Sequence, residues 1–282
     1  MSVLASFANW PLGALFAVCV VLSVLFALGG RGHQGGRWRA AAFYGGLATI
    51  VLALDTPIDA YADRLFWVHM VQHVLLLTVA PPLLVLGRPW PRMWMPFPAG
   101  ARSAAARGLA RGTWSAPLRL LARASSRPPV AYTVFAATVA VWHLPSLYGA
   151  AVDNEGVHVL EHGCFLAAAL LFWGPLLEAP PIRARVDHLR RALWFGAGAL
   201  PGWILAIVLA YASTPLYDVY ASLPHRAFGL SALGDQQIAA GVMWVPGSLA
   251  YFVAFIFYIY RWLEPGTEAP RRGPRPEELS WT

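Results

Sequence analysis

Apolar runs separated by short polar segments repeat along almost the whole chain. The runs cover about residues 7–28, 40–56, 64–86, 130–147, 157–177, 192–213 and 236–261, and Gly, Pro or charged residues bound them. An α-helix of about 17 to 25 apolar residues is long enough to cross the hydrocarbon core of a bilayer. The pattern therefore predicts an all-α fold, a bundle of seven transmembrane helices that forms one membrane domain over residues 1–262.

Two regions outside these runs are more polar. In the connection 87–129 apolar residues alternate with arginines. This connection either lies along the inner leaflet, with its arginines at anionic headgroups, or forms a solvated basic loop. The tail 263–282 is rich in proline and charge, a composition that predicts disorder.

The composition excludes a soluble globular domain. Of the 282 residues, 58% are hydrophobic and only 12% are charged, which is far from the mix found in soluble domains. The net charge of +7 comes from 21 basic residues, all of them arginine, and such a balance suits either nucleic acid or a membrane surface. Because the arginines gather in the connections between apolar runs, we expect membrane lipid as their partner, and no nucleic acid.

The arginines also predict the orientation of the helices. Residues 29–39, 87–129, 178–192 and the tail from Arg261 hold 19 of the 21 arginines, so the positive-inside rule assigns these segments to the cytoplasm. The opposite connections are acidic and belong outside. The N-terminus is then outside and the C-terminus cytoplasmic. No basic residue precedes the first run, so we expect an uncleaved, outward N-terminus.

Histidines mark one depth of the predicted bundle. His69 and His73 are spaced i, i+4, as are His158 and His162, and this spacing puts both members of a pair on one helix face. His143 ends the fourth run in the sequence WHLP. With the orientation above, all five belong to the outer ends of their helices. Polar side chains in hydrocarbon are costly unless they have partners, so the five imidazoles need a shared explanation.

A metal site is the explanation that we favour. Neutral imidazole binds copper, zinc, iron and nickel, and two histidines at i, i+4 can hold one ion from a single helix. Met70 and Met243 are additional candidates, because soft sulfur would favour Cu(I) over zinc, although each also suits a packing role. The predicted ligands are His69, His73, His143, His158 and His162. A hydrogen-bonded polar cluster, proton transfer and haem binding are the alternatives at this point.

Carboxylates and amides lie at the same predicted depth. Such groups commonly accept the second N–H of a metal-binding imidazole and thereby fix its tautomer. We expect this role for Asp55, Asp59, Glu161, Asp235 and Gln236. Asp235 has a second interpretation, because its carboxylate can cap the seventh helix, which begins at this point.

Three parts of the chain resemble one protein family. The segments HMVQHVLLLTVAPPLLVLGRPW, WHLPSLYGAAVDNEGVHVLEHGCFLAAALLFW and DQQIAAGVMWVPGSLAYFVAF occur in this order. They are similar to the multi-span CtaG family of cytochrome c oxidase assembly factors. The ordered set of HxxxH, WHLP, HxxxH and DQQ is more specific than any single motif, and the resemblance extends over about residues 40–261.

The resemblance implies a multi-pass protein of the bacterial inner (plasma) membrane that is not an enzyme. It implies a role in assembling a haem-copper oxidase, with copper delivered to oxidase subunits and a copper chaperone on the outer side as a further partner. The residues that match the family's marked positions are His69, Met70, His73, His143, His158, His162, Asp235 and Gln236. Two alternatives come from other classes of protein: a seven-span intramembrane zinc hydrolase, which uses metal-activated water, and a metal-free scaffold that holds oxidase subunits.

Overall fold

Helices make up most of the described part of the chain. The computed structural model describes residues 13–30, 36–178, 186–223 and 226–264, and these residues contain no strand. The predicted all-α fold is confirmed. The first residues of the first predicted span and almost all of the tail that we expect to be disordered lie outside the described ranges.

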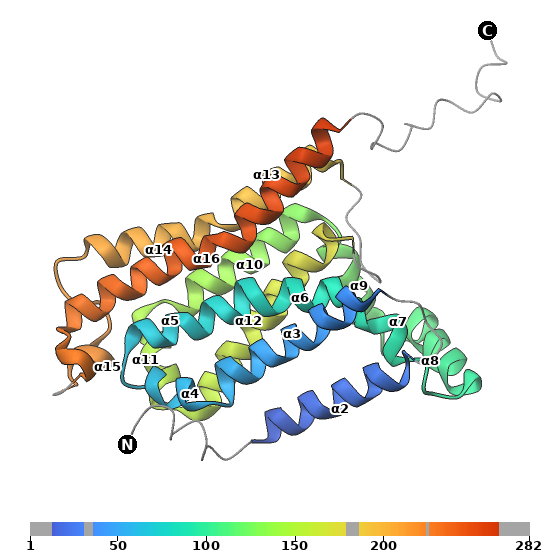
Figure 1. The fold of residues 1–282 in the computed structure, drawn as a ribbon, viewed down its shortest axis with the longest axis horizontal. Helices are drawn as coiled ribbons and strands as arrows, with labels where there is room; N and C mark the ends of the chain where they lie inside the picture. The colour runs from blue at the N-terminus through green and yellow to red at the C-terminus, as the bar shows by residue number, and fades with distance from the viewer. Residues whose placement is uncertain (1–12, 31–35, 179–185, 224–225, 265–282) are drawn as a thin grey trace, which may run out of the picture.

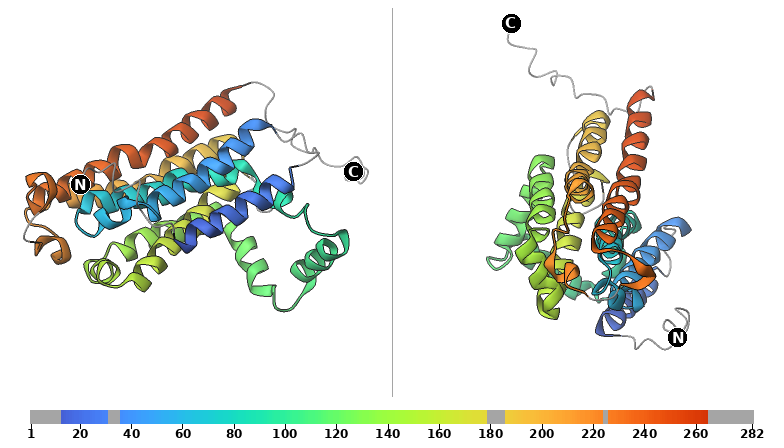
Figure 2. Two further views of the ribbon diagram at one scale, coloured as in Figure 1. Left: turned by 60° about the horizontal axis from the view of Figure 1, so that its bottom comes forward. Right: turned by 90° about the vertical axis from the view of Figure 1, so that its left-hand side faces the viewer.

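The long helices run side by side between two ends of the molecule (Figures 1 and 2). The uninterrupted ones are α2 (Ala14–Leu28), α3 (Arg37–Leu54), α10 (Pro128–Trp142), α12 (Glu155–Leu176) and α16 (Ala232–Leu263). Two others are broken. α5 (Phe66–Val74) continues through the π-helix η1 (Leu75–Val79) into α6 (Ala80–Gly87), and α13 (His188–Gly198) continues into α14 (Leu200–Tyr211).

Short helices lie in the connections at the two ends. α4 (Pro57–Ala62), α11 (Pro145–Asp153) and α15 (Asp218–Ala221) gather on the left in Figure 1, and we call this the acidic end. The 3₁₀ turn η2 (Ala227–Gly229) precedes α16. α7 (Pro89–Met93), α8 (Ala99–Arg111) and α9 (Ala116–Ser125) lie on the right, at what we call the arginine-rich end. The long basic connection is therefore largely helical.

Length and composition identify fewer spans than the sequence predicts. Four helices are long and apolar enough to cross a membrane: Phe66–Gly87, Glu155–Leu176, His188–Tyr211 and Ala232–Leu263. α10 and α11 make a fifth if this pair, bent by 71°, is one span. α2 is apolar but has only 15 residues, and the apolar character of α3 is diluted by Arg37 and Arg39. Seven spans are not confirmed for the described residues, and the orientation stays a prediction.

Two adjacent prolines account for the break between α5 and α6. The carbonyl of Leu77 would accept from residue 81 in an α-helix and from residue 82 in a π-helix, but both are proline and have no N–H. The indole of Trp173, on α12, donates to this carbonyl instead, at 3.0 Å. A helix break inside an apolar bundle needs such a partner for the freed carbonyl. The bond therefore ties α12 to the helix that carries His69 and His73.

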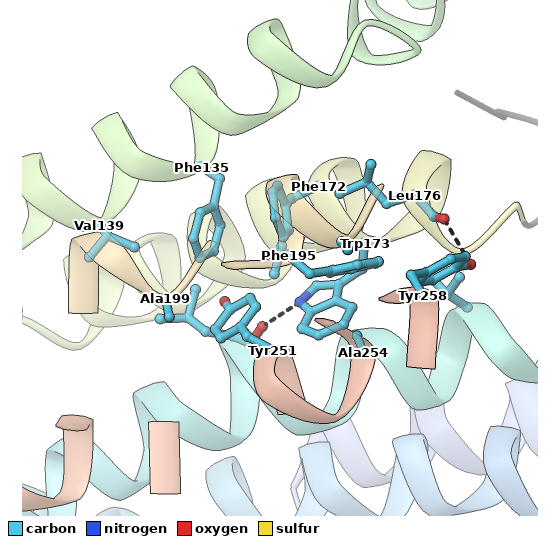
Figure 3. Packing of buried hydrophobic residues seen from close by; sticks show 14 of the residues in the cluster. Phe135, Val139, Phe172, Trp173, Leu176, Phe195, Ala199, Tyr251, Ala254 and Tyr258 are labelled. Carbon is cyan, nitrogen blue, oxygen red and sulfur yellow. Dashed lines mark hydrogen bonds between the residues drawn. The ribbon is translucent and has the colours of Figure 1, made fainter. Parts of the chain in front are cut away.

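Aromatic side chains fill the core where α12, α13 and α16 meet. Figure 3 shows the ring of Trp173 near those of Phe195 and Tyr251, with centroids 5.1 and 5.0 Å away, distances typical of favourable ring contacts. Gly198 permits this close packing, because a Cβ there would come within 2.8 Å of the ring of Phe172. These contacts fix α12 against α16 and so fix the frame of the site described next.

Candidate metal centre

The start of α5 is held by a residue from α16. Asp235 accepts hydrogen bonds from the backbone N–H groups of Phe66 (3.0 Å) and Trp67 (2.9 Å). A carboxylate at a helix N-terminus both satisfies free N–H groups and interacts favourably with the helix dipole. The predicted cap on its own helix is provided instead by Ser231, whose side chain accepts from the N–H of Gly234. Asp235 thus positions the helix that carries His69 and His73.

Four polar side chains from α5 and α12 converge in the interior. They are His69, His73, Glu161 and His162, and we call them the four-residue group. Each offers one ligand atom, and these atoms all lie within 4.8 Å of one another. The Glu161 carboxylate lies between the two imidazoles of α5, 3.8 Å from His69 Nε2 and 3.7 Å from His73 Nε2. All four residues are buried.

A tyrosine from the acidic end fixes the tautomer of His69. Tyr220 donates its hydroxyl proton to the carbonyl of Ala62 at 2.7 Å, and burial raises the pKa of this hydroxyl well above its ordinary value, so it stays protonated. Its oxygen can therefore only accept from His69 Nδ1, 2.9 Å away. With the proton on Nδ1, Nε2 of His69 presents its lone pair toward Glu161.

His143 fixes the tautomer of His73. Nδ1 of His143 lies 2.7 Å from the carbonyl oxygen of Val139, which can only accept, so His143 carries its proton there. Its Nε2 then accepts from His73 Nδ1, at 3.4 Å. His73 is left with a lone pair on Nε2, again toward Glu161. His143, which the sequence predicts as a ligand, thus acts on the four-residue group through His73 in this arrangement.

The atoms facing the centre of the four-residue group lack hydrogen-bond partners within the described chain. These atoms are Nε2 of His69, His73 and His162 and both carboxylate oxygens of Glu161. Buried polar groups are nearly always paired, and an unpaired buried carboxylate is especially costly. A metal cation would satisfy the five atoms at once, since lone-pair imidazole nitrogens and a carboxylate are ligands of Cu and Zn. The residues fit a metal ion.

Three other predicted ligands lie next to this group. His158 is only partly buried, and its ring centroid is 4.2 Å from that of His162 and 5.0 Å from that of His69. Met70 and Met243 belong to an apolar cluster with Phe66. Met243 also lines, together with His73, a cavity of about 30 Å³. Both methionines therefore have the surroundings of packing residues.

Three of the residues expected to accept from an imidazole have other contacts. Asp55 caps α2, accepting from the backbone N–H of Gly13 (2.9 Å) and Phe16 (3.1 Å). Asp59 accepts from the side chain of Gln72 at 2.8 Å. Gln236 joins the end of α14 to the following segment, with the N–H of Leu216 and the carbonyl of Leu209 as its partners. None of these hydrogen bonds involves a histidine. Glu161 is itself a member of the four-residue group.

Sequence reasoning missed the tyrosines that surround the histidines. Tyr148 is fully buried, with its ring centroid 5.0 Å from that of His69. Tyr217 donates to the carbonyl of His143 at 2.9 Å, and Tyr220 fixes His69. The spacing of Tyr217 and Tyr220 in the connection LYDVY was a usable signal, because it places two hydroxyls on one face of the same short turn.

The acidic end provides carboxylates close to the histidines. A cavity of about 770 Å³ there is lined by Asp63, Asp153 and Asp218. Burial raises the pKa of the Asp63 carboxyl, so protons compete with cations at this carboxylate more than at a solvated aspartate. Grouped carboxylates create a negative potential that attracts cations.

Tyr220→Phe is expected to weaken metal binding without removing a ligand. The change deletes the oxygen that accepts from His69 Nδ1, so the tautomer of His69 is no longer fixed, and the metal affinity should fall roughly 10- to 100-fold. Metal titration of the purified protein measures this. Tyr258→Phe is the matched control, since Tyr258 is also buried and donates to a backbone carbonyl, that of Leu176. Equal losses in both variants would contradict the assignment.

Comparisons with known proteins support a family assignment. Curated relatives include uncharacterized proteins of Mycobacterium bovis and Mycobacterium tuberculosis, each 24% identical over 275 residues, which are 94% of this chain and 41% of the relative. An uncharacterized protein of Mycobacterium leprae is 24% identical over 270 residues, or 91% of this chain and 40% of the relative. This chain thus spans about two fifths of the length of these relatives. No solved structure matches it.

The family comparison covers nearly the whole chain. The model of the cytochrome c oxidase caa3 assembly factor family matches residues 5–264. This range contains all four members of the four-residue group and the three segments on which the resemblance was based. The protein belongs to the cytochrome c oxidase caa3 assembly factor family.

Proposed function

We propose that the protein binds copper at the four-residue group and delivers it to a cytochrome c oxidase during assembly. Family membership gives the assembly role and favours a role without catalysis. The observation that carries the copper proposal is the set of five buried ligand atoms, from three histidines and Glu161, that have no hydrogen-bond partner among the described residues. Copper is the proposed metal because a haem-copper oxidase requires it.

The donor atoms bear on the oxidation state of the copper. Three imidazole nitrogens and a carboxylate oxygen suit Cu(II) and Zn(II), whereas the preference for Cu(I) depends on sulfur ligands. Met70 and Met243 pack in an apolar cluster. We therefore expect the site to accept Cu(II) as well as Cu(I), and metal titrations with each ion test this.

The location suggests a direction of transfer. The four-residue group lies near the N-termini of α5 and α12, on the side of the acidic end. By the arginine distribution this end faces the outside of a bacterial inner membrane. Copper would then arrive on the outer side, from a chaperone or in free form, and pass to an oxidase subunit beside the helices. A site made of few ligands from two helices suits release better than a closed structural site.

The test is oxidase assembly in cells that lack the protein. Cells complemented with the wild-type chain should contain active oxidase, and cells complemented with His162→Ala should not, while copper added in excess should restore part of the activity. Thr138→Ala, on the exposed face of α10, is the control and should behave as wild type. Full oxidase activity with the histidine variant would support the metal-free scaffold. Bound zinc with amidase activity would support the hydrolase.

A further inference from the structure

A second large cavity lies between α5–α6 and α16, away from the four-residue group. Its volume is about 950 Å³, and its walls are largely apolar. α16 packs along α5 but separates from α6 toward the arginine-rich end (Figure 1). Pro82 and Pro246 line opposite walls. Each proline removes one helical N–H and tends to bend its helix, so both positions favour the separation that opens this groove.

The base of the groove is formed by α12. Trp173 and Leu177 lie there, and the walls bear Leu86, Val253 and Phe257 among others. Figure 3 labels Trp173, Ala254 and Tyr258, which line this cavity and lie near one another. The side chains of Val253 and Phe257 are more than half exposed. Exposed apolar side chains beside an apolar cavity suit an apolar ligand that reaches the groove sideways from a bilayer.

One end of the groove is polar and basic. Glu178, His188 and Arg261 line the cavity at the arginine-rich end. The Glu178 carboxylate is paired with the buried Arg191, 2.6 Å away, and so has its charge compensated. The side chain of Arg261 is about 40% exposed and lies 3.8 Å from that of Glu264. A guanidinium has five N–H donors, so Arg261 can bind a phosphate in addition to its protein partners. The end of the groove therefore favours an anion.

We propose that this groove binds an anionic phospholipid, with its acyl chains between α6 and α16 and its phosphate at Arg261 and His188. The volume is at the upper end of the range of about 300–1,000 Å³ for small-ligand pockets. Basic pockets between membrane helices on the cytoplasmic side commonly hold anionic headgroups. A transmembrane helix of a partner would match the apolar walls but would bring no anion to Arg261. This inference does not depend on the metal site.

Native mass spectrometry of the full chain in detergent tests the proposal. The wild-type protein, titrated with phosphatidylglycerol and with phosphatidylcholine, should retain more of the anionic lipid. Arg261→Gln with His188→Gln removes the arginine charge and the imidazole, and it should lower retention of phosphatidylglycerol about fivefold, to the level of phosphatidylcholine. Arg190→Gln is the control, because Arg190 lies at the same end and is exposed but is not among the residues that line the cavity. It should retain lipid as the wild type does.

A second variant tests the acyl-chain part of the groove. Ala250→Trp places an indole in the cavity and should remove bound lipid of either headgroup, with folding checked by size-exclusion chromatography. If that variant does not fold, the charge variants still test whether the groove binds anionic lipid. Equal retention of the two lipids by the wild type, or an equal loss in Arg190→Gln, would overturn the proposal. So would a photo-crosslinker at Val253 that captures a protein segment in place of lipid.

Discussion

Replacing His69 and His73 together by alanine is expected to abolish copper binding by the purified protein. The two residues provide two of the three imidazole nitrogens in the four-residue group, and both present a lone pair toward Glu161 as a result of their hydrogen bonds to Tyr220 and His143. Of the group only His162 and Glu161 would remain, and two ligands do not complete the coordination of Cu(II) or zinc. Elemental analysis of protein loaded with copper and then desalted measures the bound metal.

The double variant needs a control that also changes two residues. Thr49→Ala with Thr138→Ala removes two hydroxyls that donate only to carbonyls of their own helices, at Gly45 and Val134, so it should retain wild-type copper. Undiminished copper in the histidine variant would refute the site.

The single histidine variants separate ligands from positioning residues. His162→Ala should lose most of the copper, because it removes a ligand atom. His143→Ala should lose less, roughly 10- to 100-fold in affinity, because His143 acts by holding His73. A larger loss from His143→Ala than from His162→Ala would reverse the two roles.

Glu161→Gln is expected to have opposite effects on metal binding and on stability. The carboxylate is fully buried without a hydrogen-bond partner in the described chain, so the metal-free protein bears the cost of that unpaired group. Glutamine keeps the size but adds an N–H₂ group that can donate to the lone pairs on His69 and His73. The metal-free variant should be more stable by about 1–3 kcal/mol, whereas its copper affinity should fall because an anionic ligand is lost.

Two measurements on the same preparations decide this prediction. Denaturant unfolding of the metal-free protein gives the stability, and copper titration gives the affinity. Glu155→Gln is the control, since Glu155 lies on α12 as well but is exposed, and it should change both quantities little. A Glu161→Gln variant that is less stable without metal, or that binds copper as tightly as wild type, would show that the carboxylate has another role.

Local spacing was enough to find much of the site. The i, i+4 pairs place His69 with His73 and His158 with His162 because a helix repeats every 3.6 residues. The rings of His69 and His73 do lie 4.4 Å apart, and those of His158 and His162 4.2 Å apart. Glu161 was within reach of the same reasoning, since it is three residues from His158 and therefore near the same face of α12.

The hydrogen-bond partners of the acidic residues could not be predicted from the sequence. Asp55 follows α3 in the sequence but caps α2, and Asp235 belongs to α16 but caps α5. Spacing shows that a carboxylate stands near a helix end, but every helix end has free N–H groups. Which of these ends it meets depends on how the helices are arranged.

The sequence by itself determined that the chain is helical and largely apolar, that its histidines form two one-face pairs, and that its family is one of oxidase assembly factors. Apolar periodicity, helical repeat and ordered motifs are local properties, so they can be read along one chain. The tertiary structure alone decided that Glu161 lies between His69 and His73, and that His143 and Tyr220 fix their tautomers. Those contacts depend on how α5, α10, α12 and α15 are rotated against one another, which packing sets and spacing does not.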